Sequence, residues 1–261
     1  MGVGKEIEKR SHIIGFQEEI SSINDESIDK FFSWFNNDMD ANAAFITGAW
    51  DFSYHIITPI MNQIKNPEEL TILEIGSGGC RILANAARYF KKAIGVDIHN
   101  ENDIVLRELN ERGISNIELY KNDGYSIPIA ENSVDIVYSF IVLQHIEKIE
   151  YFIKYLKEIN RVLKKDGIAV IYFGRLYKYS FNKTSKLLLW FDRVYEHFML
   201  KGKFIEIPAR VNAVNLRISL RYAKKYSKIH GFKVVKILVS RRNVPNGVKL
   251  FGGQNGLVLK K

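Results

Sequence analysis

The chain has 261 residues, 46% of them hydrophobic, which is enough apolar material for a sizeable globular core. Its single cysteine excludes an internal disulfide framework and a cysteine-cluster metal site, and it fits a reducing cytoplasm. No apolar run approaches the roughly 18 residues that span a bilayer, and the first residues lack the hydrophobic region of a signal peptide. We therefore expect a cytoplasmic protein without a transmembrane segment.

The net charge of +9 is divided unevenly along the chain. Residues 1–174 hold 18 Lys and Arg against 26 Asp and Glu, whereas residues 175–261 hold 20 against 3. This asymmetry indicates an acidic partner for the carboxyl-terminal part, although a solvated basic surface explains the same numbers equally well.

Residues 1–69 are predicted to be helical and are too few for a domain of their own. A helix can open at residues 25–27, and a second is predicted from residue 43 or 51 to residue 65, ending before Pro67. The apolar residues of the first helix recur at helical spacing, and they are Ile28, Phe31, Phe32 and Phe35. The second contains aromatic residues that we interpret as a packing face, namely Trp50, Tyr54 and His55.

Residues 70–81, with the sequence LTILEIGSGGCR, join a short β-branched run to a glycine-rich corner. Residues 71–75 have the length and composition of a buried parallel strand, and Gly76 to Gly79 favour neither a strand nor a helix. A helix is predicted over residues 80–90, and its first N–H groups lack partners. We expect a ligand close to this backbone, because the glycines have no Cβ atoms to block it.

Strands and helices alternate from this corner onward, which predicts βαβ units and a parallel sheet covered on both faces. The predicted strands after the first span residues 93–98, 117–120, 134–140 and 168–173, and the predicted helices between them span residues 101–112 and 149–163. Residues 177–215 break the rhythm with an amphipathic helix over residues 183–200. We expect its apolar stripe to pack on the core; the stripe consists of Leu187, Trp190, Phe191, Val194 and Phe198.

The chain closes with a helix over residues 216–230 and two extended runs, residues 234–239 and 250–259. The turn residues of the segment 243–247 between these runs predict an antiparallel hairpin at the end of the sheet.

Two nucleotide-binding patterns compete for the glycine corner. A dinucleotide fingerprint needs a small residue five positions after its first glycine, where this chain has Arg81, so that pattern fails. The other pattern has glycines at alternate positions and an acidic residue two positions before the first of them. Glu74, Gly76 and Gly78 fit this pattern, and Cys80 stands where it has its third glycine. Asp97 and Asp123 end the next two predicted strands, where a carboxylate can bind ribose hydroxyls or an adenine amino group. A helix cap and an Asx turn are the competing interpretations of these two residues.

The chain resembles class I S-adenosylmethionine-dependent methyltransferases over residues 70–173. The segments that carry the resemblance are LEIGSGG, GVDI, NDGYSIPIAENSVDIVYSF, IVLQHI and EINRVLKKDGIAVIYF. The resemblance implies a doubly wound α/β fold of the Rossmann-like kind, with a mostly parallel seven-stranded sheet ending in an antiparallel hairpin. It also implies S-adenosylmethionine as the cofactor. The cofactor-binding residues that it implies are Glu74, Gly76, Ser77, Gly78, Asp97, Ile98, Asp123, Gly124, Ser139 and Phe140.

We expect one methyltransferase domain over residues 1–261. Its expected parts are an N-terminal helical cap over the cofactor cleft (1–69), a cofactor-binding core (70–176), a helical acceptor-side insertion (177–215), and the last helix with the terminal hairpin (216–261).

His145 follows the fourth strand and is the candidate catalytic base or acceptor-orienting residue, although a histidine that only shapes the loop fits equally well. No metal-ligand spacing is recognisable, so we predict metal independence. Residues 175–228 hold 13 Lys and Arg against 3 Asp and Glu, which predicts a small or glycan-like, anionic acceptor. The candidate substrate-binding residues are Arg175, Lys178, Arg210 and Arg217.

Three alternatives stay open. The protein could instead be an RNA methyltransferase, because a basic carboxyl-terminal part with interleaved aromatics suits nucleic acid. It could be a non-catalytic nucleotide-binding module. The helix 183–200 could also lay its apolar stripe on a membrane surface or a partner. The sequence predicts no oligomeric state.

Overall fold

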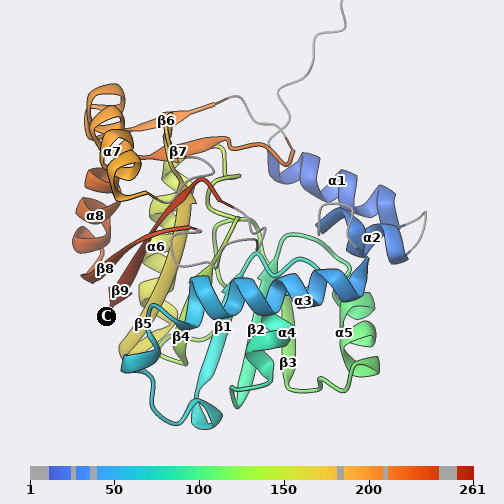
Figure 1. Cartoon of the computed structure of the whole chain (residues 1–261). Helices are drawn as coiled ribbons and strands as arrows, with labels where there is room; N and C mark the ends of the chain where they lie inside the picture. Colours follow the sequence, from blue (N-terminus) through green and yellow to red (C-terminus); the bar gives the residue numbers. More distant parts are fainter. Residues whose placement is uncertain (1–11, 25–27, 36–39, 181–184, 208–210, 241–251) are drawn as a thin grey trace, which may run out of the picture.

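The computed structural model describes residues 12–24, 28–35, 40–180, 185–207, 211–240 and 252–261 (Figure 1). It is an α/β structure in which a central twisted sheet is covered by helices on both faces, as predicted. Within the described residues, no helix combines the length and hydropathy needed to cross a membrane.

The sheet holds nine strands in the described part of the chain, with the order β3-β2-β1-β4-β5-β7-β6 along its main path. The first five are parallel to one another, and the strand order reverses between β1 and β4. In open α/β sheets ligands bind beyond the carboxyl ends of the strands at such a reversal. These strands are β1 (Thr71–Ile75), β2 (Lys92–Asp97), β3 (Ile117–Lys121), β4 (Val134–Ser139) and β5 (Leu163–Gly174).

The predicted antiparallel end of the sheet is confirmed. Strand β9 (Gln254–Lys260) pairs antiparallel with β5 on one side and with β8 (Lys233–Val239) on the other. The predicted turn over residues 243–247 lies outside the described residues.

Two further short strands were not predicted. β6 (Phe204–Glu206) pairs antiparallel with β7 (Leu216–Ile218), and β7 pairs with β5 at Gly174. β4 pairs with one edge of β5, and β9 pairs with the other edge. The ribbon of β6 and β7 therefore lies on the β4 side of β5, beyond the carboxyl end of β4. The prediction of helix from residue 216 is therefore wrong: Leu216 and Ile218 are both fully buried around a half-buried Arg217, which is the period of a strand. The helix α8 (Leu220–Ile229) starts after Ser219, whose side chain caps it.

The hydrophobic core has two layers, one on each face of the sheet. α4 (Leu83–Ala87) and α5 (Asn102–Glu111) pack on one face of the sheet with the N-terminal helices, and α6 (Ile149–Val162) and α8 pack on the other (Figure 1). α4 begins three residues later than predicted because Cys80 has φ +60°, a left-handed conformation that a helix cannot contain.

The N-terminal part forms three helices. They are α1 (His12–Asn24), α2 (Ile28–Phe35) and α3 (Ala41–Asp51), which Asp40 caps through the N–H of Ala43. α3 continues into a π-helical turn, η1 (Phe52–Ile57), and two short 3-10 turns follow, η2 (Met61–Gln63) and η3 (Pro67–Glu69). The predicted helix opening at residues 25–27 lies outside the described residues.

The helix α7 (Lys186–Leu200) exists close to its predicted bounds, but the expectation that its apolar stripe packs on the core is wrong. Leu187 is 62% exposed, Trp190 56% and Phe198 70%. The helix instead buries Leu189, Asp192, Glu196 and Leu200.

Candidate functional site

The glycine corner after β1 is a tight backbone turn. Gly76 has φ +77°, and a Cβ there would lie 2.1 Å from Cγ2 of Val142. Gly78 has φ +48°, and a Cβ there would lie 2.7 Å from the ring of Phe35 on α2. Both positions need glycine for backbone conformation and for space. The corner therefore places bare backbone between the end of β4 and the N-terminal helices.

Asp97, the last residue of β2, holds this corner in place. Its Oδ2 accepts the backbone N–H of Gly78 at 2.7 Å, and its Oδ1 accepts the N–H of Ile98 at 2.6 Å. Each carboxylate oxygen keeps a lone pair for another donor. The arrangement suits the paired hydroxyl groups of a ribose beside the corner.

Glu74 lies beneath the corner as a buried carboxyl, 2% exposed. Its Oε2 accepts the hydroxyl of Tyr138 at 2.9 Å. Burial raises the pKa of Glu74 to about 8, against the opposing effects of this hydrogen bond and the charge of Arg81. A cationic ligand in contact with Glu74 would shift this equilibrium towards the carboxylate.

Arg81 follows the corner, and its side chain forms an ion pair with a residue of the N-terminal helices. Its Nη1 lies 2.6 Å from Oδ2 of Asp51, a fully buried carboxylate at the end of α3. The other oxygen of Asp51 lies 3.0 Å from Nδ1 of His55, and the ring of His55 stacks on Phe140 with 4.4 Å between centroids. This chain of contacts links the π-helical turn to the loop after β4.

Asn122, which sequence reasoning missed, is the polar side chain that follows β3 in the site. It is buried, its Oδ1 accepts the N–H of Gly124 at 3.2 Å, and its Nδ2 donates to Ser126 O at 3.1 Å. Asp123 does not line the cavity. Its carboxylate accepts hydrogen bonds from the N–H groups of Tyr125 and Ser126, which is the Asx turn that the sequence offered as the alternative interpretation. An amide immediately before Asp123 was the signal available in the sequence.

The loop after β4 is apolar on its cavity side. Phe140, Ile141, Val142 and Ile146 line it, and Ile141 has φ +67°, a strained conformation for a β-branched residue. Such strain is typical of functional loops. Ser139 does not line the cavity, because it is fully buried and donates its hydroxyl to Ile75 O at 3.3 Å.

His145 ends this loop with its ring fixed by two contacts. Nδ1 lies 2.6 Å from the carbonyl oxygen of Ala213, so it carries the proton, and Nε2 lies 3.2 Å from Nε2 of Gln144, so it accepts. Burial lowers the pKa of His145, against the smaller effect of the Ala213 contact. The neutral form is therefore favoured, and its ring faces Phe16 of α1 at 6.0 Å.

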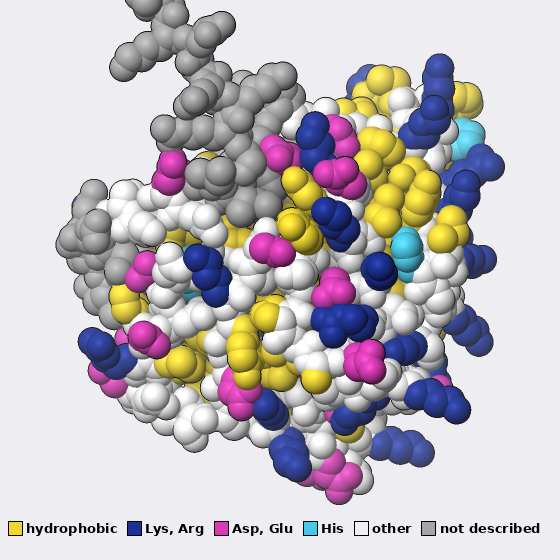
Figure 2. Space-filling model, turned by 180° about the vertical axis from the view of Figure 1, so that it is seen from behind, with side chains coloured by type: hydrophobic (Ala, Val, Ile, Leu, Met, Phe, Trp, Pro, Cys, Tyr) yellow, Lys and Arg dark blue, Asp and Glu magenta, His cyan; other side chains and the backbone are white. Residues whose placement is uncertain are grey.

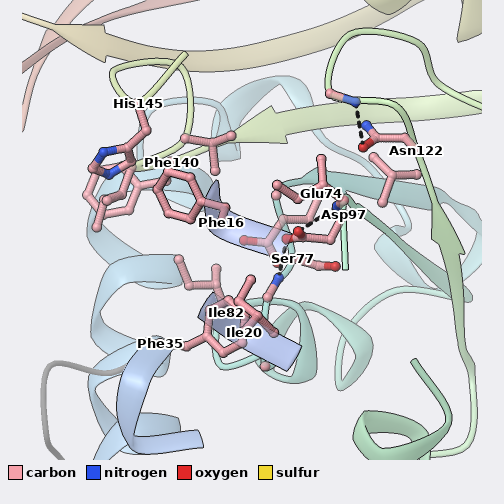
Figure 3. A pocket seen from close by; sticks show the side chains of 18 of the residues that line it. Phe16, Ile20, Phe35, Glu74, Ser77, Ile82, Asp97, Asn122, Phe140 and His145 are labelled. Atoms are coloured by element: carbon pink, nitrogen blue, oxygen red, sulfur yellow. Dashed lines mark hydrogen bonds between the residues drawn. The ribbon is translucent and has the colours of Figure 1, made fainter. Parts of the chain in front are cut away.

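The glycine corner, Asp97, Glu74, Asn122 and the loop after β4 surround one cavity of about 200 Å³, which lies beyond the carboxyl ends of β1, β2 and β4 (Figure 3). Figure 3 shows Glu74, Ser77 and Asp97 in its centre, Asn122 on one side, and Phe16, Phe140 and His145 on the other. Of the predicted cofactor-binding residues, the lining includes Glu74, Gly76, Ser77, Gly78, Asp97, Ile98, Gly124 and Phe140. α1 and α2 close it with Phe16, Ile20, Trp34 and Phe35.

The donor set of this cavity fits S-adenosylmethionine. Two carboxyl groups, Glu74 and Asp97, face the space, and the cationic side chain of Arg81 is already paired with Asp51. Acidic groups favour a ligand with an ammonium and a sulfonium and disfavour the pyrophosphate of a dinucleotide. At Gly76 and Gly78 the space that a Cβ would take is filled by Val142 and Phe35, so the glycines let the loop after β4 and helix α2 pack directly on the corner.

The predicted substrate-binding residues lie elsewhere. Arg175 is 5% exposed, donates to Ser180 Oγ at 2.8 Å, and lies 3.7 Å from Asp192 Oδ2. Neither it nor Lys178 nor Arg217 lines the cavity, and Arg210 lies outside the described residues. Their assignment to substrate binding stays a prediction.

Cys80 is fully buried, and burial, followed by the charges of Glu74 and Asp97, raises the pKa of its thiol. It is therefore a poor nucleophile. The described residues contain no group of three or more His, Cys, Asp or Glu side chains that could hold a metal ion.

Comparison with known proteins finds a family that part of the chain around this cavity resembles. Residues 73–171, which run from β1 to β5 and include both Glu74 and Asp97, match the family described as "Methyltransferase domain". Residues 73–171 are therefore similar to a methyltransferase domain. This agrees with the class I resemblance that the motifs indicated, and the solved structures of the same fold include S-adenosylmethionine-dependent methyltransferases.

Two curated relatives match parts of the chain. The chain is 28% identical over 109 residues to the uncharacterized methyltransferase YcgJ of Bacillus subtilis, covering 40% of this chain and 42% of that protein. It is 38% identical over 79 residues to the demethylmenaquinone methyltransferase of Staphylococcus carnosus, covering 30% of this chain and 31% of that protein. The matches thus span less than half the length of either relative.

Solved structures show the same fold over most of the chain. The YcgJ structure superposes with a TM-score of 0.53 at 16% identity, covering 79% of this chain and 97% of that one. An S-adenosylmethionine-dependent methyltransferase from Aquifex aeolicus gives 0.54 at 14% identity, covering 85% and 98%. One from Methanosarcina mazei gives 0.55 at 18% identity, covering 78% and 96%.

Proposed function

We propose that the protein transfers the methyl group of S-adenosylmethionine to a small acceptor that enters on the apolar side of the cavity. The observation that supports this best is the pairing of two carboxyl groups, Glu74 and Asp97, with an apolar wall at the point where the strand order reverses. The sulfonium of the cofactor supplies an already activated methyl group.

The chain's own residues would bind and orient. Asp97 would accept the ribose hydroxyls, and its bonds to Gly78 and Ile98 keep the carboxylate in position. Asn122 and the backbone at Gly124 would border the adenine. Glu74 would face the methionyl end, where the positive charge of the ligand favours the ionised form of Glu74.

The apolar wall would exclude water from the transfer. Phe140 lies on His55, and Phe16 from α1 lies against His145, so the wall is built from two parts of the chain. In-line positioning of this kind contributes up to about 7 to 11 kcal/mol to a two-substrate reaction.

His145 would orient the acceptor or accept its proton. It is neutral, but its Nε2 already accepts from Gln144, so proton transfer requires that contact to open. We therefore propose that His145 mainly orients the acceptor, and that it acts as a base only where the acceptor is a hydroxyl group.

The anionic, glycan-like acceptor stays a prediction within this proposal. The observation behind it is the positive charge of residues 175–228. Arg175 already faces Asp192, so its charge is partly met within the protein.

Calorimetric titration with S-adenosylmethionine, S-adenosylhomocysteine and NAD tests the cofactor. We expect the first two to bind and NAD not to bind, and NAD binding alone would overturn the proposal. Release of S-adenosylhomocysteine is then measured over a panel of sugar phosphates, neutral phenols and an RNA oligonucleotide. Cofactor binding with no turnover on any acceptor would favour the non-catalytic module, and turnover on RNA alone would favour the RNA methyltransferase.

A further inference from the structure

The helix α7 presents five large apolar side chains to solvent, whereas its two acidic side chains are buried together with Leu189 and Leu200. The exposed apolar residues and their exposed fractions are Leu187 (62%), Trp190 (56%), Phe191 (43%), Phe198 (70%) and Met199 (56%). Asp192 is 1% exposed and Glu196 is 5% exposed. A surface helix ordinarily has the opposite arrangement. We call the five exposed side chains the apolar face of α7.

Polar contacts fix this orientation. Asp192 accepts the N–H groups of Lys178 and Tyr179 at 2.8 Å and that of Ser180 at 2.9 Å, and it faces Arg175. Glu196 accepts the side-chain amide of Asn255 at 3.3 Å. Turning the helix to bury its aromatic residues would break these contacts and leave the buried N–H groups of residues 178–180 without partners. The contacts therefore favour the outward orientation of the apolar face.

A basic groove adjoins this face. It lies between α7 and α8 and is lined by five cationic residues, together with Leu220 and Ile237; the five are Arg193, Arg221, Lys224, Lys225 and Lys228. α8 has no acidic residue. Among the described residues none of the five forms an ion pair, so their charge is available to a ligand.

The groove and the apolar face form one continuous surface. On α7, Lys186, Arg193 and His197 follow one another at intervals of seven and four residues, which places them on a single flank of the helix beside the apolar face. Figure 2 shows hydrophobic side chains at the upper right and a series of Lys and Arg down the right-hand edge, over α7 and α8.

From this surface we infer that the protein docks on an anionic lipid bilayer, with the apolar face of α7 in the interface and the basic groove on the lipid phosphates. Trp and Phe between aliphatic residues, flanked by Lys and Arg, are the composition of helices that lie in a membrane interface. A symmetric contact between two copies would bring the two grooves' cations close together. RNA would pair with the cations but would leave Leu187 and Met199 in water.

Vesicle sedimentation of the full chain tests the inference. We expect binding to vesicles of equal parts phosphatidylcholine and phosphatidylglycerol, weak binding to phosphatidylcholine alone, and loss of binding at high salt. Lys224→Glu with Lys228→Glu should weaken binding by about tenfold or more, because each Lys near an anionic surface contributes about 1 kcal/mol. Trp190→Ser with Phe198→Ser should weaken it by a similar factor through lost apolar insertion.

Matched controls separate the surface from general charge and hydrophobicity. Lys91→Glu with Lys157→Glu reverses two exposed lysines elsewhere, and Ile46→Ser removes an exposed apolar residue of α3 that is 63% exposed. Neither should change vesicle binding by more than about twofold. The substituted residues do not line the cofactor cavity, so S-adenosylmethionine binding and thermal melting should be unchanged in every variant.

Three results would overturn the inference. Equal binding of both vesicle types by the parent and the two test variants would show that this surface is not used. Binding to an RNA oligonucleotide without binding to vesicles would assign the groove to nucleic acid. A dimer in sedimentation equilibrium that Trp190→Ser with Phe198→Ser disrupts, with no vesicle binding, would assign the face to a second copy. The outcome is independent of methyl transfer, which is measured on soluble acceptors.

Discussion

Glu74→Gln should make the protein's stability less dependent on pH. The pKa of Glu74 is about 8 in the folded protein, because burial disfavours the charge, and near the ordinary 4.5 when unfolded. Below the pKa of the unfolded state, Glu74 is protonated in both the folded and the unfolded protein, so its contribution to stability does not depend on pH. As pH rises towards the folded value, the unfolded state ionises first, and the folded state loses stability relative to it.

The size of the effect follows from the same two values. Between the unfolded and folded pKa values, Glu74 alone removes about 1.4 kcal/mol from the free energy of unfolding per pH unit. Between about pH 5.5 and 7.5 the parent should therefore lose roughly 2 to 3 kcal/mol that the variant retains. Gln keeps the shape and an oxygen that can accept the Tyr138 hydroxyl.

Urea denaturation of the cofactor-free protein at several pH values measures this difference. Glu118→Gln is the matched control, since Glu118 is an exposed strand glutamate whose pKa is lowered by Lys92 and Tyr120, so it is ionised in both states over this range. Parallel pH curves for the parent and Glu74→Gln would refute the reasoning. The variant should also bind S-adenosylmethionine more weakly, because it cannot carry a negative charge towards the ligand.

Asp97→Ala should weaken S-adenosylmethionine binding by roughly 2 to 3 kcal/mol, since it removes the ribose acceptor and the bonds to Gly78 and Ile98; unchanged affinity in calorimetry would remove Asp97 from the site. His145→Gln should lower kcat and flatten the acid limb of the pH profile if the ring accepts a proton, whereas a change in KM alone would leave it an orienting role. Phe152→Ala, in the fully buried layer between α6 and the sheet, should lower the free energy of unfolding by about 3 to 5 kcal/mol in urea denaturation without changing cofactor affinity.

Local sequence patterns determined the core of this protein. The β-branched runs, the periodic helices and the glycine corner act over a few residues, so the parallel strands β1 to β5, α6 and the terminal hairpin follow from the chain alone. Glu74, Gly76, Gly78 and Asp97 could be placed in one site for the same reason, because parallel strands bring their carboxyl ends to one edge.

Contacts between distant segments decided the rest. Leu216 to Ile218 form a strand because Gly174 of β5 offers them an edge, which no local pattern records. Asn122 enters the cavity in place of its neighbour Asp123 because the carboxylate is used by the turn that follows. The apolar face of α7 points outward because Asp192 finds Arg175 and three backbone N–H groups inside. A helical pattern fixes which residues share a face, but only the partners available in the folded molecule decide which face is buried.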